Sequence, residues 1–279
     1  MRSVVLGATG IVGGYIVAHL VRSGETPVAI SRSPHAGDGI EWLQGDLTAP
    51  QGLTLPDVDR LFCTVDVGAL ADALPQLCTP SLKRVVAFTS TSIVTKIESE
   101  IEEERLLLQR LADGERRLIA ACERLGIAWT ILRPTIIYAE GRDANITRLA
   151  RLIGKYGVLP LAGRGAGRRQ PVHAEDLAIG AIQASESTAA AGRTYALPGA
   201  ETITYREMVG RIFDGLHKPR RILSVPPVLW RAAFALAKPL FPKANAAMGS
   251  RMAMDMVFDD VPAKQDFGWN PRGFRPRFD

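Results

Sequence analysis

The stretch Gly7-Ala8-Thr9-Gly10-Ile11-Val12-Gly13 indicates the architecture of this chain. It follows the apolar run Ser3–Leu6, which predicts a buried strand, and it opens a helical pattern that continues to about Ser23. Glycines at the turn leave backbone amides at a helix start open to a pyrophosphate, and the last glycine lets helix and strand pack closely. The stretch predicts a dinucleotide-binding turn whose bordering positions are Gly7, Thr9, Gly10, Ile11, Val12 and Gly13. A glycine-rich turn without a ligand is the alternative.

Short apolar runs alternate with helical patterns through the first half of the chain. This alternation indicates parallel strands joined by crossover helices. Between the last two runs, the apolar stripe of residues 97–125 predicts one long helix or two. Together these elements predict an α/β fold, a Rossmann doubly wound parallel sheet. The expected strands are Ser3–Leu6, Pro27–Ser31, Ile40–Leu43, Arg60–Thr64, Arg84–Thr89 and Ala128–Leu132.

The composition changes after Pro134, where Pro and Gly become more frequent and helical patterns alternate with short extended pieces. We expect residues 1–134 to form the NAD(P)-binding domain and residues 135–279 to form mainly a smaller substrate-binding lobe. The helical pattern that begins at Ala174 is expected to return to the sheet over about residues 174–192. The C-terminal lobe is therefore expected to be discontinuous.

Length and composition are those of an ordinary globular protein. The 279 residues are 47% hydrophobic and 23% charged, which excludes a disordered, collagenous or coiled-coil chain. Thirty-four Lys and Arg against 29 Asp and Glu give a net charge of +5, a mild excess that suits an anionic small ligand. No clustered basic stripe is present in the sequence, so we expect a small-molecule substrate of unknown identity and no nucleic acid.

The cysteines and the start of the chain favour a cytoplasmic protein. Cys63, Cys78 and Cys122 lie in unrelated contexts without a Cys-x-x-Cys pair, so neither a disulfide framework nor a zinc site is expected. Met1 leads at once into the first strand pattern, without the regions of a signal peptide, and no run of about 18 apolar residues predicts a membrane span.

A metal site is not expected around His173, Glu175 and Asp176. Their spacing does not place two ligands on one helix face, and Asp176 is better interpreted as a helix N-cap.

The end of the second expected strand indicates which dinucleotide is bound. An NAD-binding protein usually carries there an acid that accepts from the ribose 2′-hydroxyl, but this chain has Ser31, Arg32 and Ser33. The Arg32 guanidinium suits a 2′-phosphate, and the two serines can add hydroxyl donors. We therefore expect a preference for NADP(H) over NAD(H), against the alternative of a solvated surface arginine.

Two further strand ends are expected to border the cofactor. After the third strand, Asp46 can accept from the adenine amino group while Leu47 packs beneath the ring, or Asp46 can serve as a turn residue. Thr64 and Val65, at the end of the fourth strand, are placed near the middle of the cofactor by position alone.

The chain resembles the short-chain dehydrogenase/reductase superfamily in its extended form, which includes sugar-nucleotide epimerases and dehydratases. Besides the glycine stretch, the matching segments are Arg84–Ser92, Trp129–Tyr138, Arg169–Asp176 and Phe267–Arg272, in the order of the family and over nearly the whole chain. Within the superfamily it is similar to an atypical branch, namely the nucleotide-binding accessory subunit of respiratory complex I and the proteins related to nitrogen-metabolite repressors. The resemblance implies that Pro134 lies beside the nicotinamide.

The sequence departs from this family where catalysis is concerned. Catalytic members use a Tyr, and a Lys four residues later on the same helix face, so that the ammonium lowers the phenol pKa. Residues 97–130 contain neither Tyr nor Lys. Aligning this helix on Glu115 before Gly126 places Leu107 and Leu111 at the positions of the Tyr and Lys pair. Ser90 and Ser92 occupy the region where the family carries a hydroxyl for the reacting oxygen. They are weak candidate catalytic residues, because hydroxyls at a strand end without a base beside them more often serve in turns and caps.

A late amphipathic stretch, residues 228–241, combines apolar side chains with two basic residues. A wall or lid of the substrate cleft is one interpretation, and a surface that binds a membrane face or a protein partner is the other. For the whole chain we carry two functional hypotheses. The first is an NADP(H)-dependent oxidoreductase or epimerase-like enzyme, and the second is a catalytically silent NADP(H)-binding protein that acts in redox sensing or assembly.

Overall fold

The computed structural model describes two compact units. Unit 1 comprises Met1–Thr135, Ala174–Leu197 and Asp259–Pro271. Unit 2 comprises Ile136–His173, Pro198–Phe258 and Arg272–Asp279. The residues that the structure describes are 1–95, 101–226, 228–230, 232, 249 and 251–278.

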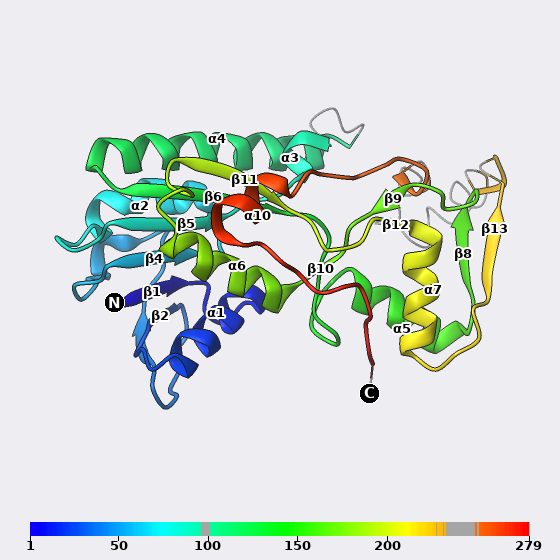
Figure 1. Ribbon diagram of the computed structural model, residues 1–279, viewed down its shortest axis with the longest axis horizontal. Helices are drawn as coiled ribbons and strands as arrows, with labels where there is room; N and C mark the ends of the chain where they lie inside the picture. Colours follow the sequence, from blue (N-terminus) through cyan, green and yellow to red (C-terminus); the bar gives the residue numbers. More distant parts are fainter. Residues whose placement is uncertain (96–100, 227, 231, 233–248, 250, 279) are drawn as a thin grey trace. The chain divides into compact units, whose positions relative to one another are not determined.

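Unit 1 is built on a parallel sheet of seven strands in the order β11-β6-β5-β4-β1-β2-β3 (Figure 1). Every neighbouring pair in this order is parallel. The strand order reverses at β1, which is the switch point of a doubly wound sheet. The predicted Rossmann fold class is confirmed. The strands are β1 Ser3–Leu6, β2 Val28–Ser31, β3 Glu41–Gln44, β4 Arg60–Cys63, β5 Arg84–Phe88, β6 Ala128–Pro134 and β11 Arg193–Leu197.

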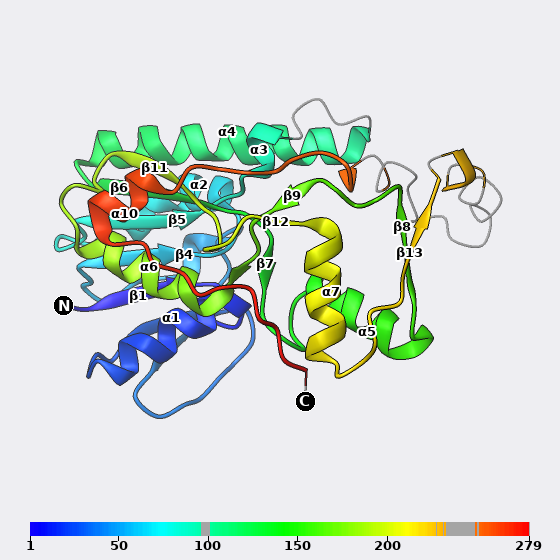
Figure 2. The ribbon, with the colours of Figure 1, turned by 45° about the vertical axis from the view of Figure 1, so that its right-hand side comes forward.

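Helices cover both faces of this sheet (Figures 1 and 2). The helices α1 (Ile11–Arg22) and α6 (Ala174–Glu186) pack together on one face, and α2 (Val67–Leu77) and α4 (Glu102–Leu125) pack together on the other. Strands β1, β4 and β5 are buried along their whole length because both of their faces are covered. Shorter elements of the unit are η1 Pro50–Gly52, α3 Ser92–Thr95 and α10 Val261–Phe267.

The six expected strands all have counterparts in the sheet, whereas β11 was not predicted. β11 lies at the sheet edge and pairs with β6, from Arg193 opposite Thr130 to Leu197 opposite Pro134. Its polar start lacks the apolar run that marks a buried strand. The long helix α4 begins at Glu102 within the described residues, and residues 96–100 lie outside them.

The chain returns to unit 1 near its end, in a segment that the expected division, with residues 135–279 mainly in the second lobe, did not single out. Residues 259–271 belong to unit 1, where α10 contacts α6 and β11. Trp269 is 2% exposed and packs on Gly180 of α6, where an added Cβ would lie 2.5 Å from the indole ring. Because Gly180 has no side chain, the Trp269 ring can pack directly against α6.

Unit 2 is smaller and has its own core. Helices α5 (Ile146–Tyr156) and α7 (Tyr205–Gly215) pack against each other and on β8 and β13, which form a parallel pair. Buried Phe213, Ile153 and Phe274 belong to this core. The remaining strands form two small sheets, β7 with β10 and β9 with β12. The bounds are β7 Ile137–Tyr138, β8 Leu159–Ala162, β9 Arg168–Arg169, β10 Val172–His173, β12 Ile203–Thr204 and β13 Ile222–Val225.

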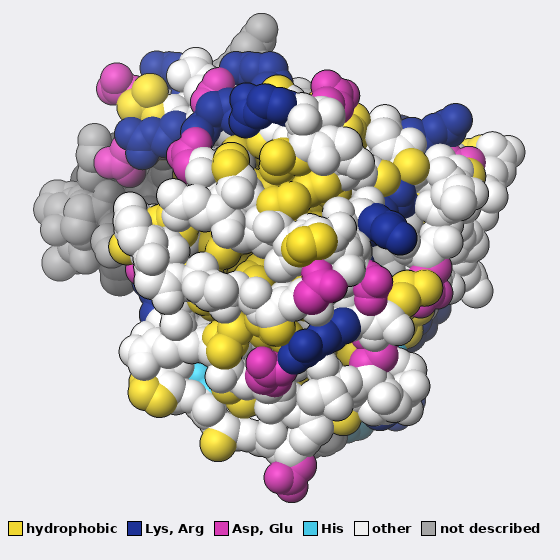
Figure 3. All heavy atoms as spheres, turned by 90° about the vertical axis from the view of Figure 1, so that its left-hand side faces the viewer, with side chains coloured by type: hydrophobic (Ala, Val, Ile, Leu, Met, Phe, Trp, Pro, Cys, Tyr) yellow, Lys and Arg dark blue, Asp and Glu magenta, His cyan; other side chains and the backbone are white. Residues whose placement is uncertain are grey.

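The surface and the helices give two further findings. On the face that Figure 3 shows, Lys and Arg side chains lie next to Asp and Glu side chains. Within the described residues, no helix has the length and hydropathy that crossing a bilayer requires.

Candidate functional site

The glycine turn after β1 presents open amides at the start of α1. Gly7 has a φ of +84°, a conformation that favours glycine, and its carbonyl accepts from the Gly10 amide at 2.9 Å. Gly10 is the N-cap of α1, and no side chain caps this end. The amides of the first turn therefore have no helical partner, and the positive end of the helix dipole adds to them. This arrangement suits a phosphate group.

Close backbone packing explains the spacing of the glycines. A Cβ on Gly13 would lie 2.1 Å from the Gly7 carbonyl oxygen, and a Cβ on Gly7 would lie 2.4 Å from Thr64 Oγ1. The Thr64 hydroxyl donates to the Leu6 carbonyl at 3.0 Å, so it supports the turn from β4. Gly7 and Gly13 are therefore required by the contact of the loop, the helix and the strand end.

A cavity of about 330 Å³ lies beside the turn, at the carboxyl ends of the first four strands. A doubly wound sheet binds its ligand at this position. The predicted cofactor residues that line it are Gly7, Thr9, Ser31, Arg32, Asp46, Leu47 and Val65. The other predicted positions are absent from its lining, namely Gly10, Ile11, Val12, Gly13, Ser33, Thr64 and Pro134.

Arg32 stands at this cavity with an exposed side chain. Within the described residues its guanidinium forms no hydrogen bond and no ion pair, while its carbonyl accepts from the Gln44 amide group. The hydroxyl of Ser31 accepts from the Ser33 amide at 3.2 Å and so shapes the turn that carries Arg32. The strand end therefore presents a cation whose donors remain available to a ligand.

Asp46 has a turn role in the structure. Its Oδ1 accepts from the Thr48 amide at 2.9 Å and from the Thr48 hydroxyl at 2.8 Å. These hydrogen bonds hold the pKa of Asp46 below its usual range, and the charge of Arg32 contributes in the same direction. The carboxylate also lines the cavity, so its predicted contact with adenine stays a prediction.

The sequence interpretation missed several residues of the cavity. Asp66 is the N-cap of α2, and its Oδ1 accepts from the Ala69 amide at 2.8 Å. An Asp just after the fourth expected strand and before an apolar helical pattern is the signal that could have identified it. The lining residues not predicted are Leu6, Ile30, Gly45, Thr48, Asp66 and Ala69.

Comparison with known proteins gives relatives across the whole chain, although no protein-family model matches. The UDP-glucose 4-epimerase of Vibrio cholerae is 23% identical, over 97% of this chain and 91% of that protein. The (4-alkanoyl-5-oxo-2,5-dihydrofuran-3-yl)methyl phosphate reductase of Streptomyces griseus is 28% identical, over 97% of this chain and 94% of that protein. Subunit 9 of the NADH dehydrogenase 1 alpha subcomplex of Arabidopsis thaliana is 25% identical, over 80% of this chain and 60% of that protein.

Solved structures show the same fold. MoeE5, determined in complex with UDP-glucose and NAD, superposes with a TM-score of 0.73 at 17% identity and covers 98% of this chain and 94% of that one. The chain is similar to the extended short-chain dehydrogenase/reductases. The predicted resemblance, including the likeness to the complex I subunit, is confirmed. The likeness to nitrogen-metabolite repressor relatives stays a prediction.

Leu107 and Leu111, which the sequence analysis aligns with the Tyr and Lys positions of the extended short-chain dehydrogenase/reductases, lie on α4, and this alignment stays a prediction. Leu107 is 62% exposed, and Leu111 is partly buried against the core of unit 1. Neither side chain can exchange a proton. The helix is anchored nearby by buried Glu115, which pairs with Arg133 of β6. This pair fixes the part of α4 that follows the two leucines to β6.

The candidate catalytic serines lie at the end of β5. The Ser90 hydroxyl accepts from the Ser92 amide at 3.1 Å, and Ser92 begins the short helix α3. Thr89, one residue earlier, has a buried hydroxyl without a hydrogen-bond partner among the described residues. The Pro134 carbonyl accepts from the amide and the hydroxyl of Thr91. Catalytic roles for Ser90 and Ser92, and the nicotinamide contact of Pro134, stay predictions.

The acidic residues near the start of α6 have separate structural roles. In unit 2, buried His173 lies 3.4 Å from Glu140, and in unit 1, Glu175 lies 3.2 Å from His19. Asp176 is not the N-cap that the sequence predicts, because α6 begins at Ala174, directly after β10, and Asp176 lies in its first turn. The described residues contain no group of three or more potential metal ligands.

Residues 228–241 are the last predicted site. Residues 231 and 233–241 lie outside the described residues, so the interpretation of this stretch stays open. In the described part, Val228 and Leu229 are exposed and Trp230 is buried.

Proposed function

We propose that the chain binds NADP(H) in the cavity beside the glycine turn and transfers hydride as an oxidoreductase or epimerase-like enzyme that lacks the Tyr and Lys pair. Relatives over 97% of the chain include a named epimerase and a named reductase. MoeE5, which has the same fold, was determined with NAD. These relatives support a nicotinamide dinucleotide, and the preference for the phosphorylated form rests on this chain's own residues.

The glycine turn would hold the diphosphate. Gly7 and Gly10 leave the backbone open at the first turn of α1, where unpaired amides and the helix dipole favour negative charge. Thr9 lines the same cavity and can add a hydroxyl donor. Val65 and Leu47 provide apolar walls.

The preference for NADP(H) rests on Arg32. Its guanidinium is exposed at the cavity and has no described partner, so an incoming phosphate would not have to displace an existing ion pair. An arginine fork donates two parallel hydrogen bonds to a phosphate, whereas a ribose hydroxyl gains little from a cation.

The side chains on α4 favour reduction over epimerisation. Bound NADPH would supply a hydride, and an acceptor with an activated double bond or carbonyl can take its proton from solvent. Epimerisation begins by removing a proton from a substrate hydroxyl, and Leu107 and Leu111 offer no base for that step. The relative named as a phosphate reductase supports the same direction.

The test compares the two cofactors in matched variants. NADPH and NADH are titrated by calorimetry into the natural chain and into Arg32→Ala. We expect the variant to lose about tenfold or more in affinity for NADPH, the value of a charged hydrogen bond of about 1.5 to 3 kcal/mol, and to keep its affinity for NADH. Arg148→Ala, which removes an exposed arginine of unit 2, is the charge-matched control and should change neither constant. Equal weakening of both cofactors in Arg32→Ala would contradict the preference.

A second candidate is a protein that binds NADP(H) without turnover, in redox sensing or assembly. The absent Tyr and Lys favour it, and so does the similarity to a named subunit of NADH dehydrogenase, of which the chain covers 60%. The natural chain is incubated with NADPH and a panel of carbonyl compounds, quinones and nucleotide sugars while nicotinamide absorbance is followed. Consumption that Gly10→Asp abolishes supports the enzyme. Tight binding without consumption supports the silent protein.

A further inference from the structure

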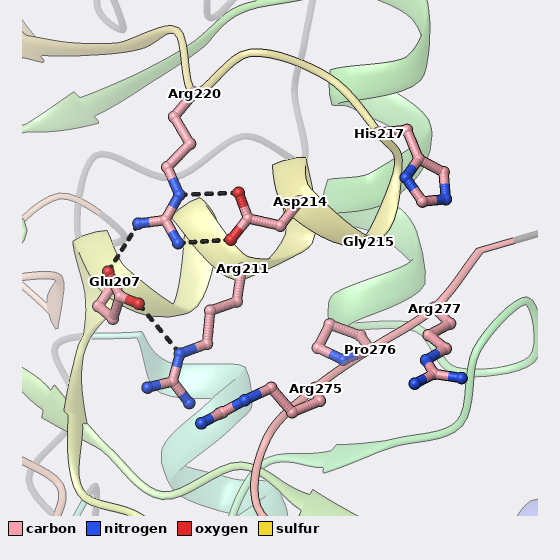
Figure 4. A pocket seen from close by; sticks show the side chains of 9 residues that line it. All are labelled: Glu207, Arg211, Asp214, Gly215, His217, Arg220, Arg275, Pro276 and Arg277. Carbon is pink, nitrogen blue, oxygen red and sulfur yellow. Dashed lines mark hydrogen bonds and ion pairs between the residues drawn. The ribbon is translucent and has the colours of Figure 1, made fainter.

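Unit 2 contains a cavity of about 760 Å³ that the proposed function does not use. Arg211 and Arg220 reach it from α7 and the loop that follows, and Arg275 and Arg277 reach it from the C-terminal segment (Figure 4). His217 also lines it. We call this site, with its four arginines and His217, the arginine cavity.

The C-terminal segment is held so that its arginines face outward. Phe274 and Pro276 are buried, while the alternate residues Arg275 and Arg277 are exposed, as expected for an extended chain. Gly215 at the end of α7 permits the contact, because a Cβ there would lie 2.2 Å from the Pro276 carbonyl oxygen. The Gly215 carbonyl also accepts from the Phe278 amide at 3.1 Å. Backbone contacts thus fix two arginines at the cavity.

Carboxylates orient three of the four guanidinium groups. Arg220 donates to both oxygens of Asp214 and to Glu207 (Figure 4). Arg211 donates to Glu207 and Glu201, and Arg275 donates to Glu201. Although partial burial opposes ionisation of Glu207 and Glu201, these arginine hydrogen bonds hold the pKa of both carboxyls below their usual range, as they do for Asp214. The pairing restricts the guanidinium groups before any ligand arrives.

Arg277 is the arginine of the cavity whose guanidinium pairs with no carboxylate among the described residues. Its amide donates to Glu140 at 3.3 Å, but within the described residues its guanidinium has no hydrogen bond and no ion pair. Four arginines line the cavity against two lining carboxylates, Glu207 and Asp214, so cations exceed anions on the lining. Glu201 pairs with Arg211 and Arg275 from outside the lining, and Glu140 accepts from the Arg277 amide. An anionic ligand would balance the excess of cations on the lining.

His217 occupies a backbone position that favours glycine. Its φ is +53°, and it is the one described residue other than glycine with a positive φ. This conformation is costly for a side chain with a Cβ, so a histidine here carries a cost that a glycine would avoid. The exposed imidazole lines the cavity and can donate to an anion.

We propose that the arginine cavity binds a small polyphosphate anion, a site separate from the one for NADP(H). Guanidinium forks match phosphate oxygens, and several of them together suit a ligand with more than one phosphate. Pro276 is the single apolar side chain among the described lining residues, which include no Phe, Tyr or Trp ring to stack on a nucleobase. The recognised chemistry is therefore the linked phosphates themselves, whether they are inorganic or carried by an organic molecule.

The test uses the full chain and inorganic triphosphate, titrated by calorimetry at about 0.15 M ionic strength. We expect sub-millimolar binding, weaker binding of orthophosphate, and a loss of about tenfold or more in Arg277→Gln. His217→Gly should weaken binding several-fold without lowering the Tm, because glycine accepts this backbone conformation. That result cannot come from misfolding.

Two control variants establish that the triphosphate binds at the arginine cavity. Arg116→Gln removes an exposed arginine of α4 with the same change of charge and should leave the affinity unchanged. Gly10→Asp blocks the glycine turn that is proposed to hold the dinucleotide, and it should also leave the affinity for triphosphate unchanged. Failure of the NADP(H) proposal is therefore distinguishable from failure of this one. The proposal would be overturned if millimolar triphosphate did not bind, or if Arg277→Gln bound it as tightly as the natural chain. It would also be overturned if Arg116→Gln lost as much affinity as Arg277→Gln, or if Gly10→Asp lost affinity for triphosphate.

Discussion

A Cβ atom on Gly13 would lie 2.1 Å from the carbonyl oxygen of Gly7, so the first turn of α1 and the glycine loop touch through their backbones. The open amides at this helix start depend on that contact. Gly13→Ala must push the helix and the loop apart, and we expect the free energy of unfolding to fall by about 1 to 3 kcal/mol or more. Denaturant unfolding measures the change. Gly52→Ala, where no atom lies within 4 Å of the added Cβ, is the control and should stay within about 0.5 kcal/mol. Equal effects of the two substitutions would show that the contact is not tight.

The packing of α2 on α4 makes a second prediction about glycine. A Cβ on Gly114 of α4 would lie 2.8 Å from the Gly68 nitrogen and 2.9 Å from its Cα. Replacing a helix-interior glycine by alanine ordinarily stabilises a protein by about 1 kcal/mol, but here overpacking of about 1 to 3 kcal/mol opposes that gain. We therefore expect Gly114→Ala to lower the Tm. Gly154→Ala in α5, where nothing lies within 4 Å, should raise it. A rise in both variants would contradict the close approach of the helices.

The pair of Glu115 and Arg133 links α4 to β6, and the Arg133 Nε donates to Glu115 Oε2 at 3.3 Å. The Glu115 side chain is 6% exposed and the Arg133 side chain 26% exposed. Glu115→Leu leaves a partly buried guanidinium without its partner, and we expect a loss of about 3 kcal/mol. Removing both charged groups in Glu115→Leu/Arg133→Leu should cost less than the sum of the two single variants. A double-mutant cycle of unfolding free energies measures this coupling, and strict additivity would rule it out.

The cysteines predict a reactivity pattern and a pH dependence. Burial raises the pKa of both the Cys63 and the Cys122 thiols from 9.0 to about 12, while Cys78 is only half-buried. Because the thiolate is the reactive form, a disulfide reagent at about pH 8 should modify Cys78 first and the other two only on unfolding. Cys78→Ser should remove the fast reaction. Fast labelling of Cys63 or Cys122 in the folded chain would contradict their burial.

The same thiols affect stability in alkali. In the unfolded chain they ionise near 9.0, whereas in the folded chain they stay protonated to about 12. The unfolded state therefore binds fewer protons in this window, and stability should be lost as the pH rises from about 9 to 12. Cys122→Ala should reduce that loss, as measured by denaturant unfolding at each pH.

Local patterns predicted much of the fold. The strand at Ser3–Leu6 has the expected bounds, because a short uninterrupted apolar run reports burial directly. The glycine spacing likewise reports a backbone approach that side chains would prevent. The edge strand β11 and the return of residues 259–271 to unit 1 escaped prediction, because each is stabilised by partners far away in the chain.

The candidate site divides in the same way. Arg32 follows a strand end and was predicted from that position, and the structure places it at the cavity. Asp66 and Thr48 line the same cavity, but their place depends on how the ends of β3 and β4 align across the sheet. Thr64 was expected at the end of the fourth strand and directly follows β4, yet its hydroxyl supports the glycine turn and does not line the cavity.

Four features could be read from single segments of the chain: the doubly wound architecture, the glycine turn, the arginine where NAD-binding proteins usually have an acid, and the lack of Tyr and Lys in residues 97–130. Spacing and residue type encode each of them locally. The tertiary structure alone shows which strand ends share a cavity in unit 1. It also shows that Arg211 and Arg277 line the same cavity of unit 2. Such groupings join residues that are distant in the chain, and their proximity is set by core packing, which no local pattern records.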